Sequence, residues 1–416
     1  MDTFCGEPAQ QSLTPTGRGL RRRLVPLQLA TVIQGIAFWV PVEKLFMSQI
    51  GFDAASVGLM AAAYAAVVPI LEVPAGIVSD RWSRKAVLIG ASLAITGSAL
   101  VGGLSHSIST YIVGALLLGV YFALYSGSID SVVYDTVLEE TGSGDRYETE
   151  IGRVRALESA AFVASALLGG WLAELTSPRL MYFLTIPFAL TSVLAYLAFR
   201  EPRLHRSEAP MSLRRHLAET ASTVARNPAI VPVVALTVVC STTLMLLFEF
   251  GPLWLVALGT SAVFFGPQWA ILMATLGFGG LLAGRLQLTR GRHLLPAAAV
   301  LVVSTLVLTT SHSALLVTLA QGMLAFLLVI AGIHANAMLH SQVASTVRAS
   351  VLSGVSAVSW MVFLPIALGF GALAQAFGIH AAAWVLVALS VLMVVLLSRR
   401  RNAEPVPAPA LEQVAA

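Results

Sequence analysis

Twelve long apolar stretches, separated by short polar segments, make up most of this 416-residue chain. A helix needs roughly 20 apolar residues to cross a bilayer core about 30 Å thick, and each stretch has close to this length. The stretches cover residues 24–47, 54–79, 85–104, 109–133, 155–176, 180–199, 229–257, 264–288, 293–310, 314–338, 348–374 and 379–398. Since a helix bonds its own backbone groups internally, the pattern predicts an all-α membrane protein with twelve transmembrane helices.

The second half of the chain repeats features of the first half. Five residues of the first half recur 208 positions later, an offset that is half of the chain length (253 − 45 for the first pair). They are Leu45, Gly51, Gly58, Gly76 and Arg84, which return as Leu253, Gly259, Gly266, Gly284 and Arg292. Each half holds six apolar stretches, so we expect two pseudo-symmetric six-helix bundles, an organisation typical of secondary transporters.

The composition supports a membrane location and indicates an orientation. Hydrophobic residues make up 57% of the chain and charged residues only 11%, whereas a water-soluble domain carries about a quarter charged residues. Nearly all Lys and Arg residues lie in the tails or beside the loops that follow even-numbered stretches. The positive-inside rule therefore predicts cytoplasmic termini, with the basic charge facing anionic lipid rather than nucleic acid. Arginine outnumbers lysine 23 to 2, which is typical of GC-rich bacterial genomes, so we expect the bacterial cytoplasmic (inner) membrane.

The same pattern divides the chain into five parts. They are a disordered cytoplasmic tail (1–23), an N-terminal six-helix bundle (24–199), a cytoplasmic linker (200–228), a C-terminal six-helix bundle (229–398) and a second cytoplasmic tail (399–416). Within the linker, apolar residues recur at helical spacing after Ser212, which predicts an amphipathic helix at the membrane interface. A flexible linker is the alternative.

Several acidic residues lie inside the predicted helices, where a charge costs about 2.5–3.5 kcal/mol on insertion scales. Glu72, Asp130 and Glu158 fall in the inner halves of the second, fourth and fifth helices, close to Arg153 and Arg155. One interpretation is a buried ion-pair network that holds the cytoplasmic side of the first bundle together. The other is that one of these carboxylates binds the proton that drives transport.

Glu249 stands apart from these acids, about twenty residues along the seventh helix and beside Phe250-Gly251-Pro252, where a helix is expected to bend. An acid at such a position suits a proton or cation site in the outer half of a cavity, and an interfacial residue in contact with headgroups is the alternative. Glu43 and Lys44 lie near the outer end of the first helix, where we expect them to reach toward the membrane surface.

Uncharged polar and aromatic side chains supply candidates for the wall of a substrate cavity. They are Gln34, Trp39, Tyr121, Tyr125, Phe250, Gln321 and Asn336, from the first, fourth, seventh and tenth helices. The alternative for the polar members is a hydrogen bond between helices. Few polar groups among many Phe, Trp, Tyr and Met residues favour a hydrophobic or amphipathic ligand over a sugar.

The segment after the second helix reads Gly76-Ile-Val-Ser-Asp80-Arg81-Trp-Ser-Arg84-Lys85. It resembles the signature between helices 2 and 3 of the major facilitator superfamily, in a bacterial, exporter-like branch. The resemblance implies two six-helix bundles that rock about a central cavity. It also implies a cytoplasmic gate built from Gly76, Asp80, Arg81, Arg84 and Lys85, with Asp135 at the foot of the fourth helix as their partner. The fourth helix lacks the arginine that many drug/proton antiporters carry there, which leaves the direction of transport open.

These observations predict a secondary active transporter that exports a small hydrophobic or amphipathic molecule by alternating access. The proton gradient would drive it, through Glu249, Asp130, Glu72 or Glu158, and no cofactor, metal or obligate protein partner is expected. A proton-coupled importer or a uniporter of the same fold is the first alternative. A polytopic membrane enzyme and a non-transporting sensor are more remote, and no P-loop for ATP hydrolysis occurs in the chain.

Overall fold

The computed structural model describes residues 17–81, 83–126, 128–202, 218, 221–222, 227, 230–288, 291–343 and 348–401. Within these ranges the chain is helical without strands, and twelve helices are long and apolar enough to cross a membrane. The predicted all-α fold with twelve spans is confirmed. The amphipathic helix expected in the linker falls almost entirely outside the described residues.

The first six spans form the N-terminal half, and the first and fourth of them are each built from two helices. In chain order the helices are α1 (Gly17–Gln34), α2 (Trp39–Gln49), α3 (Ala54–Arg81), α4 (Arg84–Leu104), α5 (Ile108–Tyr125), α6 (Ser128–Thr141), α7 (Tyr147–Leu175) and α8 (Pro178–Ala198).

The C-terminal half repeats this plan, with breaks in the seventh and twelfth spans. Its elements are α10 (Val231–Phe250), α11 (Pro252–Ala257), the short 3₁₀ helix η2 (Ala262–Phe264), α12 (Phe265–Ala283), α13 (Gly291–Thr310), α14 (Ala314–Gln342), α15 (Arg348–Phe377), α16 (Ile379–Ala382) and α17 (Trp384–Arg401).

Polar side chains set where several helices begin. The first N–H groups of a helix have no partner within it, and a Ser or Asp just before the helix can accept from them. Ser83 and Ser177 cap α4 and α8 in this way. At α3, Asp53 Oδ1 accepts from the Ser56 N–H at 2.8 Å, while Ser56 Oγ accepts from the Asp53 N–H at 2.8 Å. These reciprocal bonds form a capping box.

The first span is broken between Gln34 and Trp39, although its apolar pattern predicts one continuous helix. Gly35 lies so close to α7 that an added Cβ would be 3.0 Å from the Glu158 carbonyl oxygen. The Phe38 N–H, freed by the break, donates to Thr185 Oγ1 at 3.1 Å. Tertiary contacts thus compensate for the lost helical bonds, and broken membrane helices of this kind commonly border binding sites.

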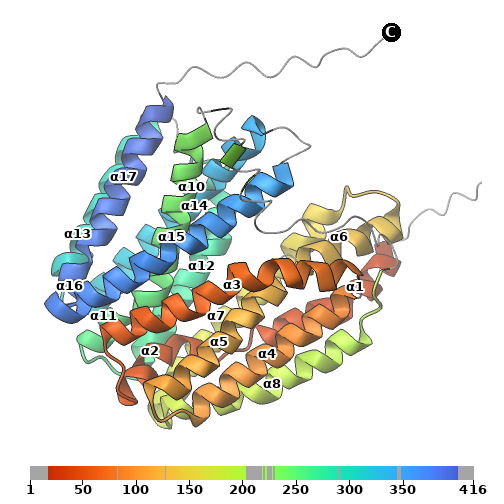
Figure 1. The fold of residues 1–416 in the computed structure, drawn as a ribbon, viewed down its shortest axis with the longest axis horizontal. Helices are drawn as coiled ribbons and strands as arrows, with labels where there is room; N and C mark the ends of the chain where they lie inside the picture. The colour runs from red at the N-terminus through yellow and green to blue at the C-terminus, as the bar shows by residue number, and fades with distance from the viewer. Residues whose placement is uncertain are drawn as a thin grey trace, which may run out of the picture.

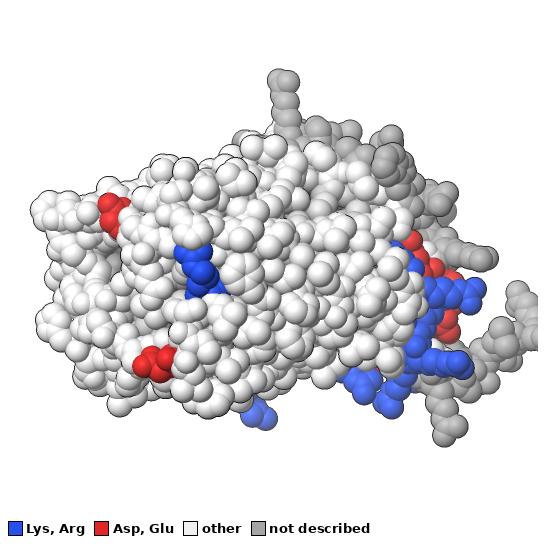
Figure 2. Space-filling model, turned by 90° about the horizontal axis from the view of Figure 1, so that it is seen from below, with Lys and Arg blue, Asp and Glu red and all other residues white. Residues whose placement is uncertain are grey.

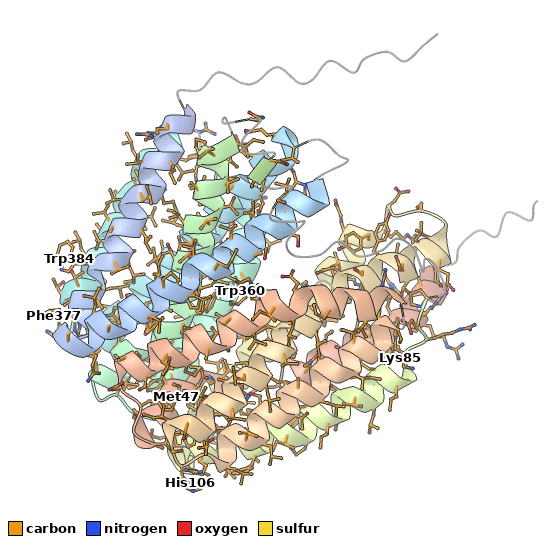
Figure 3. All side chains as sticks on the ribbon, in the orientation of Figure 1. Met47, Lys85, His106, Trp360, Phe377 and Trp384 are labelled. Carbon is orange, nitrogen blue, oxygen red and sulfur yellow. The ribbon has the colours of Figure 1, made fainter. Side chains whose placement is uncertain are left out.

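The halves are arranged as a V, joined where α3 packs on α15 and α7 packs on α12 (Figure 1). We call the end of the bundle that carries the start of α1 and Lys85 the basic face, and the end that carries His106 and Phe377 the opposite face (Figure 3). The helices of the two halves converge toward the opposite face and spread apart toward the basic face (Figure 1). Figure 2 shows most of the visible Lys and Arg side chains gathered at one end of the molecule, with acidic side chains among them.

Candidate functional site

A cavity of about 380 Å³ lies between the two halves, and both contribute to its wall. Its volume falls in the range of sites for small organic molecules. Most of the lining is aromatic or aliphatic, and three carboxylates, those of Glu43, Glu158 and Glu249, interrupt it. The aromatic lining residues are Trp39, Tyr64, Tyr121, Phe122, Tyr125, Phe162, Phe248 and Trp269.

Four of the residues proposed from the sequence for the cavity wall do line it: Gln34, Trp39, Tyr121 and Tyr125. The ring of Trp39 is stacked on Tyr182, with centroids 5.1 Å apart. Tyr121 and Tyr125 are stacked on each other at 5.3 Å, because they lie one turn apart on α5. The wall of the N-terminal half is therefore held by ring contacts within that half.

The structure places Phe250, Gln321 and Asn336 outside the lining of this cavity. Phe250 is fully buried and packs on Phe370 of α15, with ring centroids 4.6 Å apart. Asn336 lies on an exposed part of α14. Apolar character and helix membership did not reveal which face of a helix meets the cavity.

Gln321 instead holds the break between α10 and α11. Its amide nitrogen and that of Gln268 both donate to the Gly251 carbonyl oxygen at 3.0 Å, and Gln268 Nε2 also donates to Gln321 Oε1 at 2.6 Å. Both glutamines are fully buried. A bend was expected at Gly251-Pro252, but the amide bridge that fixes it comes from α12 and α14.

Glu249, just before this break, belongs to a charged cluster that joins the two halves. Lys44 Nζ of α2 donates to Glu249 Oε1 at 2.5 Å and to Glu43 Oε2 at 2.8 Å. The Tyr64 hydroxyl of α3 donates to Glu249 Oε2 at 2.9 Å. We call Glu43, Lys44, Tyr64 and Glu249 the interhalf cluster. Two of its hydrogen bonds cross from the N-terminal half to the C-terminal half and end on the same carboxylate.

The expectation that Glu43 and Lys44 reach toward the membrane surface was wrong. The Lys44 side chain is 1% exposed and lies inside the protein, where a charged amine is tolerated only with good partners. Its main partner is 205 positions away in the chain, so no local sequence signal could have revealed it. Tyr111 extends the network by donating to Glu43 Oε1 at 2.8 Å.

A second charged group lies beside the cavity, between the first turn of α6 and the N-terminal half of α7. Arg155 donates to Asp130 Oδ2 at 3.0 Å and to Glu158 Oε2 at 3.2 Å, and the Tyr125 hydroxyl donates to Glu158 Oε1 at 2.7 Å. We call these four residues the arginine cluster. Of the acids grouped with them from the sequence, Glu72 makes no hydrogen bond or ion pair with the described residues, although it is partly buried.

The signature segment lies at the basic face. Arg84 forms an ion pair with Asp135 of α6 and donates to the Ser131 carbonyl oxygen at 3.0 Å. Lys85 donates to the Leu197 and Phe199 carbonyl oxygens at the end of α8, at 2.6 and 2.9 Å. The side chains of Asp80 and Arg81 and the surroundings of Gly76 lie outside the described part of the structure.

Glu201 is a residue of this region that the sequence did not single out. Its carboxylate accepts from the Arg84 N–H and from Ser83 Oγ, both at 2.6 Å, and so caps the start of α4. A carboxylate at a helix N-terminus is favoured by the helix dipole. Together with the bonds from Lys85 of α4 to the end of α8, it ties the ends of two neighbouring helices of one half to each other.

The model of the family described as Major Facilitator Superfamily matches residues 27–369. The chain is a member of the Major Facilitator Superfamily. It is thus a multi-pass membrane transporter rather than an enzyme, and the twelve helices and two similar halves described above are those of that family.

Two kinds of relatives accompany the family assignment. Multidrug resistance protein 1 of Bacillus subtilis is 27% identical over 169 residues, which are 40% of this chain and 42% of that protein. The quinolone resistance protein NorA of Staphylococcus aureus (strain MRSA252) is 18% identical over 172 residues, which are 41% of this chain and 43% of that protein. The matches therefore span only about two fifths of the length of these curated relatives.

Solved structures share the fold over nearly the whole chain. The nucleoside transporter NupG aligns with a TM-score of 0.71 at 15% identity, covering 90% of this chain and 98% of NupG. A D-xylose-proton symporter aligns with a TM-score of 0.64 at 15% identity, covering 90% and 97%. A bacterial homologue of the human lysosomal transporter Spinster aligns with a TM-score of 0.68 at 12% identity, covering 93% and 94%. At these identities the comparison establishes the fold and not the substrate.

Proposed function

We propose that this transporter exports a small hydrophobic or amphipathic molecule by alternating access, driven by inward proton flow. The observation that carries the proposal is the position of Glu249. Its carboxylate lines the cavity and also accepts the two hydrogen bonds, from Lys44 and Tyr64, that join the halves. A proton on this one group therefore changes both the charge of the cavity and the contact between the halves.

The proton step follows from the partners within the interhalf cluster. Protonation of Glu249 removes the negative charge that faces Lys44, and the ammonium group then has Glu43, 2.8 Å away in its own half, as its charged partner. The hydrogen bond between the halves weakens, while the charge of Lys44 remains paired with that of Glu43. Because an unpaired buried charge costs several kcal/mol, this exchange lets the halves separate without leaving an isolated charge.

The arginine cluster offers a second place for a proton. Two carboxylates, those of Asp130 and Glu158, share the single guanidinium of Arg155, so the group carries one excess negative charge. Glu72 is a third candidate because it is partly buried and lacks a described partner. The interhalf cluster is preferred because it alone of the three connects both halves.

The orientation follows from the charge distribution. We place the basic face in the cytoplasm, since the positive-inside rule favours Lys and Arg on that side of a bacterial cytoplasmic membrane. The conformation described here would then be the inward-facing one. Arg84 and Asp135, which are already paired here, would belong with Asp80 and Arg81 to the cytoplasmic gate that closes in the opposite state.

The substrate class is argued from the lining and from the relatives. Eight aromatic residues surround the cavity and suit a flat or apolar ligand, because aromatic rings bury large areas with few polar demands. The names of the curated relatives, multidrug and quinolone resistance proteins, favour export of such molecules. A proton-coupled importer is the second candidate, favoured by the likeness in fold to a xylose-proton symporter.

The test uses purified protein in proteoliposomes with a pH-sensitive dye inside. A panel of lipophilic cations and hydrophobic antibiotics is added outside, with nucleosides and sugars as the contrasting panel. Proton movement that depends on a member of the first panel, in the antiport direction, is the expected result. Proton movement that accompanies only nucleosides or sugars, in the symport direction, would replace export by import. Transport of a substrate without any proton flux would remove the coupling step.

A further inference from the structure

The two halves meet backbone to backbone at two places near the opposite face. At the first, α3 crosses α15. A Cβ added at Gly58 would lie 2.7 Å from the Ala367 carbonyl oxygen, and one added at Gly371 would lie 2.6 Å from the Ala54 carbonyl oxygen. Such distances are too short for any side chain, so this approach requires glycine on both helices.

At the second place α12 crosses α7 in the same manner. A Cβ added at Gly266 would lie 2.7 Å from the Ala166 carbonyl oxygen, and one added at Gly170 would lie 3.0 Å from the Ala262 carbonyl oxygen. Here too, glycines on both helices let the backbones touch. In each crossing, each of the two glycines faces the carbonyl oxygen of an alanine on the opposing helical segment.

A side-chain hydrogen bond lies next to each crossing. Gln375 Oε1 of α15 accepts from the Ala54 N–H at 3.2 Å, and Glu174 Oε2 of α7 accepts from the Ala262 N–H at 2.8 Å. Ala54 is the first residue of α3, and Ala262 is the first residue of η2, which leads into α12. First-turn N–H groups have no partner within a helix, and here the acceptor comes from the other half of the protein.

The two sites are copies of one arrangement in sequence as well as in space. Ala54 and Gly58 return as Ala262 and Gly266, 208 positions later. The residues that meet them also form a repeat with an offset of 201. Ala166, Gly170 and Glu174 correspond to Ala367, Gly371 and Gln375. We call the first site (Ala54, Gly58, Gly371, Gln375) and the second site (Gly170, Glu174, Ala262, Gly266) the two clasps.

We propose that Glu174 and Gln375 are paired gating residues, each sealing one clasp and together holding the opposite face closed. Each hydrogen bond joins one half to the other, so both are broken when the halves separate at this face. Both side chains are exposed, and water replaces the lost partners when they part. Opening is therefore reversible, and the two bonds set how often the closed state is populated. Neither residue lines the cavity, so a bound substrate would not contact them directly.

The experiment measures distances between spin labels in lipid nanodiscs, with no substrate added. Labels at His106→Cys and His312→Cys report on the opposite face, since both residues are exposed and lie in different halves. Labels at Arg146→Cys and Arg285→Cys, also exposed, report on the basic face. Cys5 is replaced by Ser in all variants, and the buried Cys240 is left in place.

The test variant is Glu174→Ala with Gln375→Ala, and the matched control is Glu174→Gln with Gln375→Glu, which keeps an acceptor oxygen at each clasp. One hydrogen bond contributes a factor of about 2 to 10 to an equilibrium, so the double alanine variant should raise the ratio of open to closed opposite face by about 4-fold or more. The basic-face distance should shorten in the same molecules, and the control should match the parent.

An alanine variant with unchanged distance distributions at both faces would overturn the proposal. So would a control variant that opens as far as the alanine variant, because it would show that an acceptor at these positions is irrelevant. If the alanine variant folds poorly, the single variants Glu174→Ala and Gln375→Ala are measured instead, and each should produce about half of the shift in free energy. Failure of the transport assay would leave this test unaffected.

Discussion

Lys44 and Glu249 are 205 positions apart in the chain, and their charged groups lie 2.5 Å apart in the structure. The bond joins α2 of one half to α10 of the other beside the cavity. Two charges that look unrelated in the sequence therefore form one ion pair, and either protonation of Glu249 or separation of the halves would break it.

The first prediction concerns the charge of Glu249. Glu249→Gln keeps an acceptor for Tyr64 but removes the carboxyl group that we propose as the proton acceptor, so transport should continue at a reduced rate without its dependence on pH. Transport of the substrate itself is measured in proteoliposomes between pH 6 and pH 8, for the variant and for the parent. An unchanged pH profile would move proton coupling to Asp130, Glu158 or Glu72.

The second prediction concerns stability. Lys44→Met leaves Glu249 as a buried carboxylate without its cation, and breaking a buried pair in this way costs about 3–5 kcal/mol. The purified variant should therefore unfold at a lower temperature than the parent. Adding Glu249→Gln should recover part of the loss, because the uncompensated charge is then removed as well. If the stability loss of the double variant equalled the sum of the losses of Lys44→Met and Glu249→Gln, the two residues would not be coupled.

The third prediction concerns the basic face. Asp135→Asn weakens the ion pair with Arg84, which ties α4 to α6 at the proposed cytoplasmic gate. We expect the variant to fold and insert normally but to transport more slowly, and Asp80→Asn to behave in the same way. Expression, thermal unfolding and flux are compared for each variant. Normal flux in both would refute the gating role of this segment.

The fourth prediction concerns the amide bridge at the break of the seventh span. Gln321→Leu removes one of the two side-chain donors to the Gly251 carbonyl oxygen and the acceptor of Gln268. Leaving buried polar groups unpaired costs about 1–3 kcal/mol, so the thermal stability should fall. Since Glu249 lies two residues before Gly251, the pH profile of transport should shift too. Gln49→Leu, at the exposed end of α2, is the control that should leave the pH profile unchanged.

The fifth prediction uses the start of α3, which lies outside the apolar span. The hydrogen bonds from Ser56 hold the pKa of the Asp53 carboxyl below its usual value. A group with a lowered pKa in the folded state stabilises the protein above its unfolded pKa of about 4, and this contribution disappears as the pH falls through the folded pKa. Asp53→Ala should thus cost about 1 kcal/mol at pH 7. Thermal unfolding at pH 7 and pH 3 should show the difference from the parent only at the higher pH.

Part of the site could be predicted from the sequence. Acidic residues inside apolar helices are costly, so Glu249, Asp130 and Glu158 stood out by their positions within the apolar stretches, and all three lie in charged clusters of the structure. The ion pair of Arg84 with Asp135, implied by the family signature, is also present. Contacts between the halves, such as that of Lys44 with Glu249, could not be derived in this way, nor could the bonds of Gln321 to Gly251 and Gln268.

The sequence by itself determined the twelve spans, the two similar halves and the face that collects basic charge. These features depend on the hydrophobicity and charge of local segments, which each segment carries wherever it is packed. Only the tertiary structure decided that Lys44 meets Glu249, that the first span breaks before Trp39, and that Glu174 and Gln375 hold the first turns of helices in the other half. Those contacts depend on the rotation and crossing of helices from different halves, and a pattern of apolar residues on all sides of a helix does not specify its rotation.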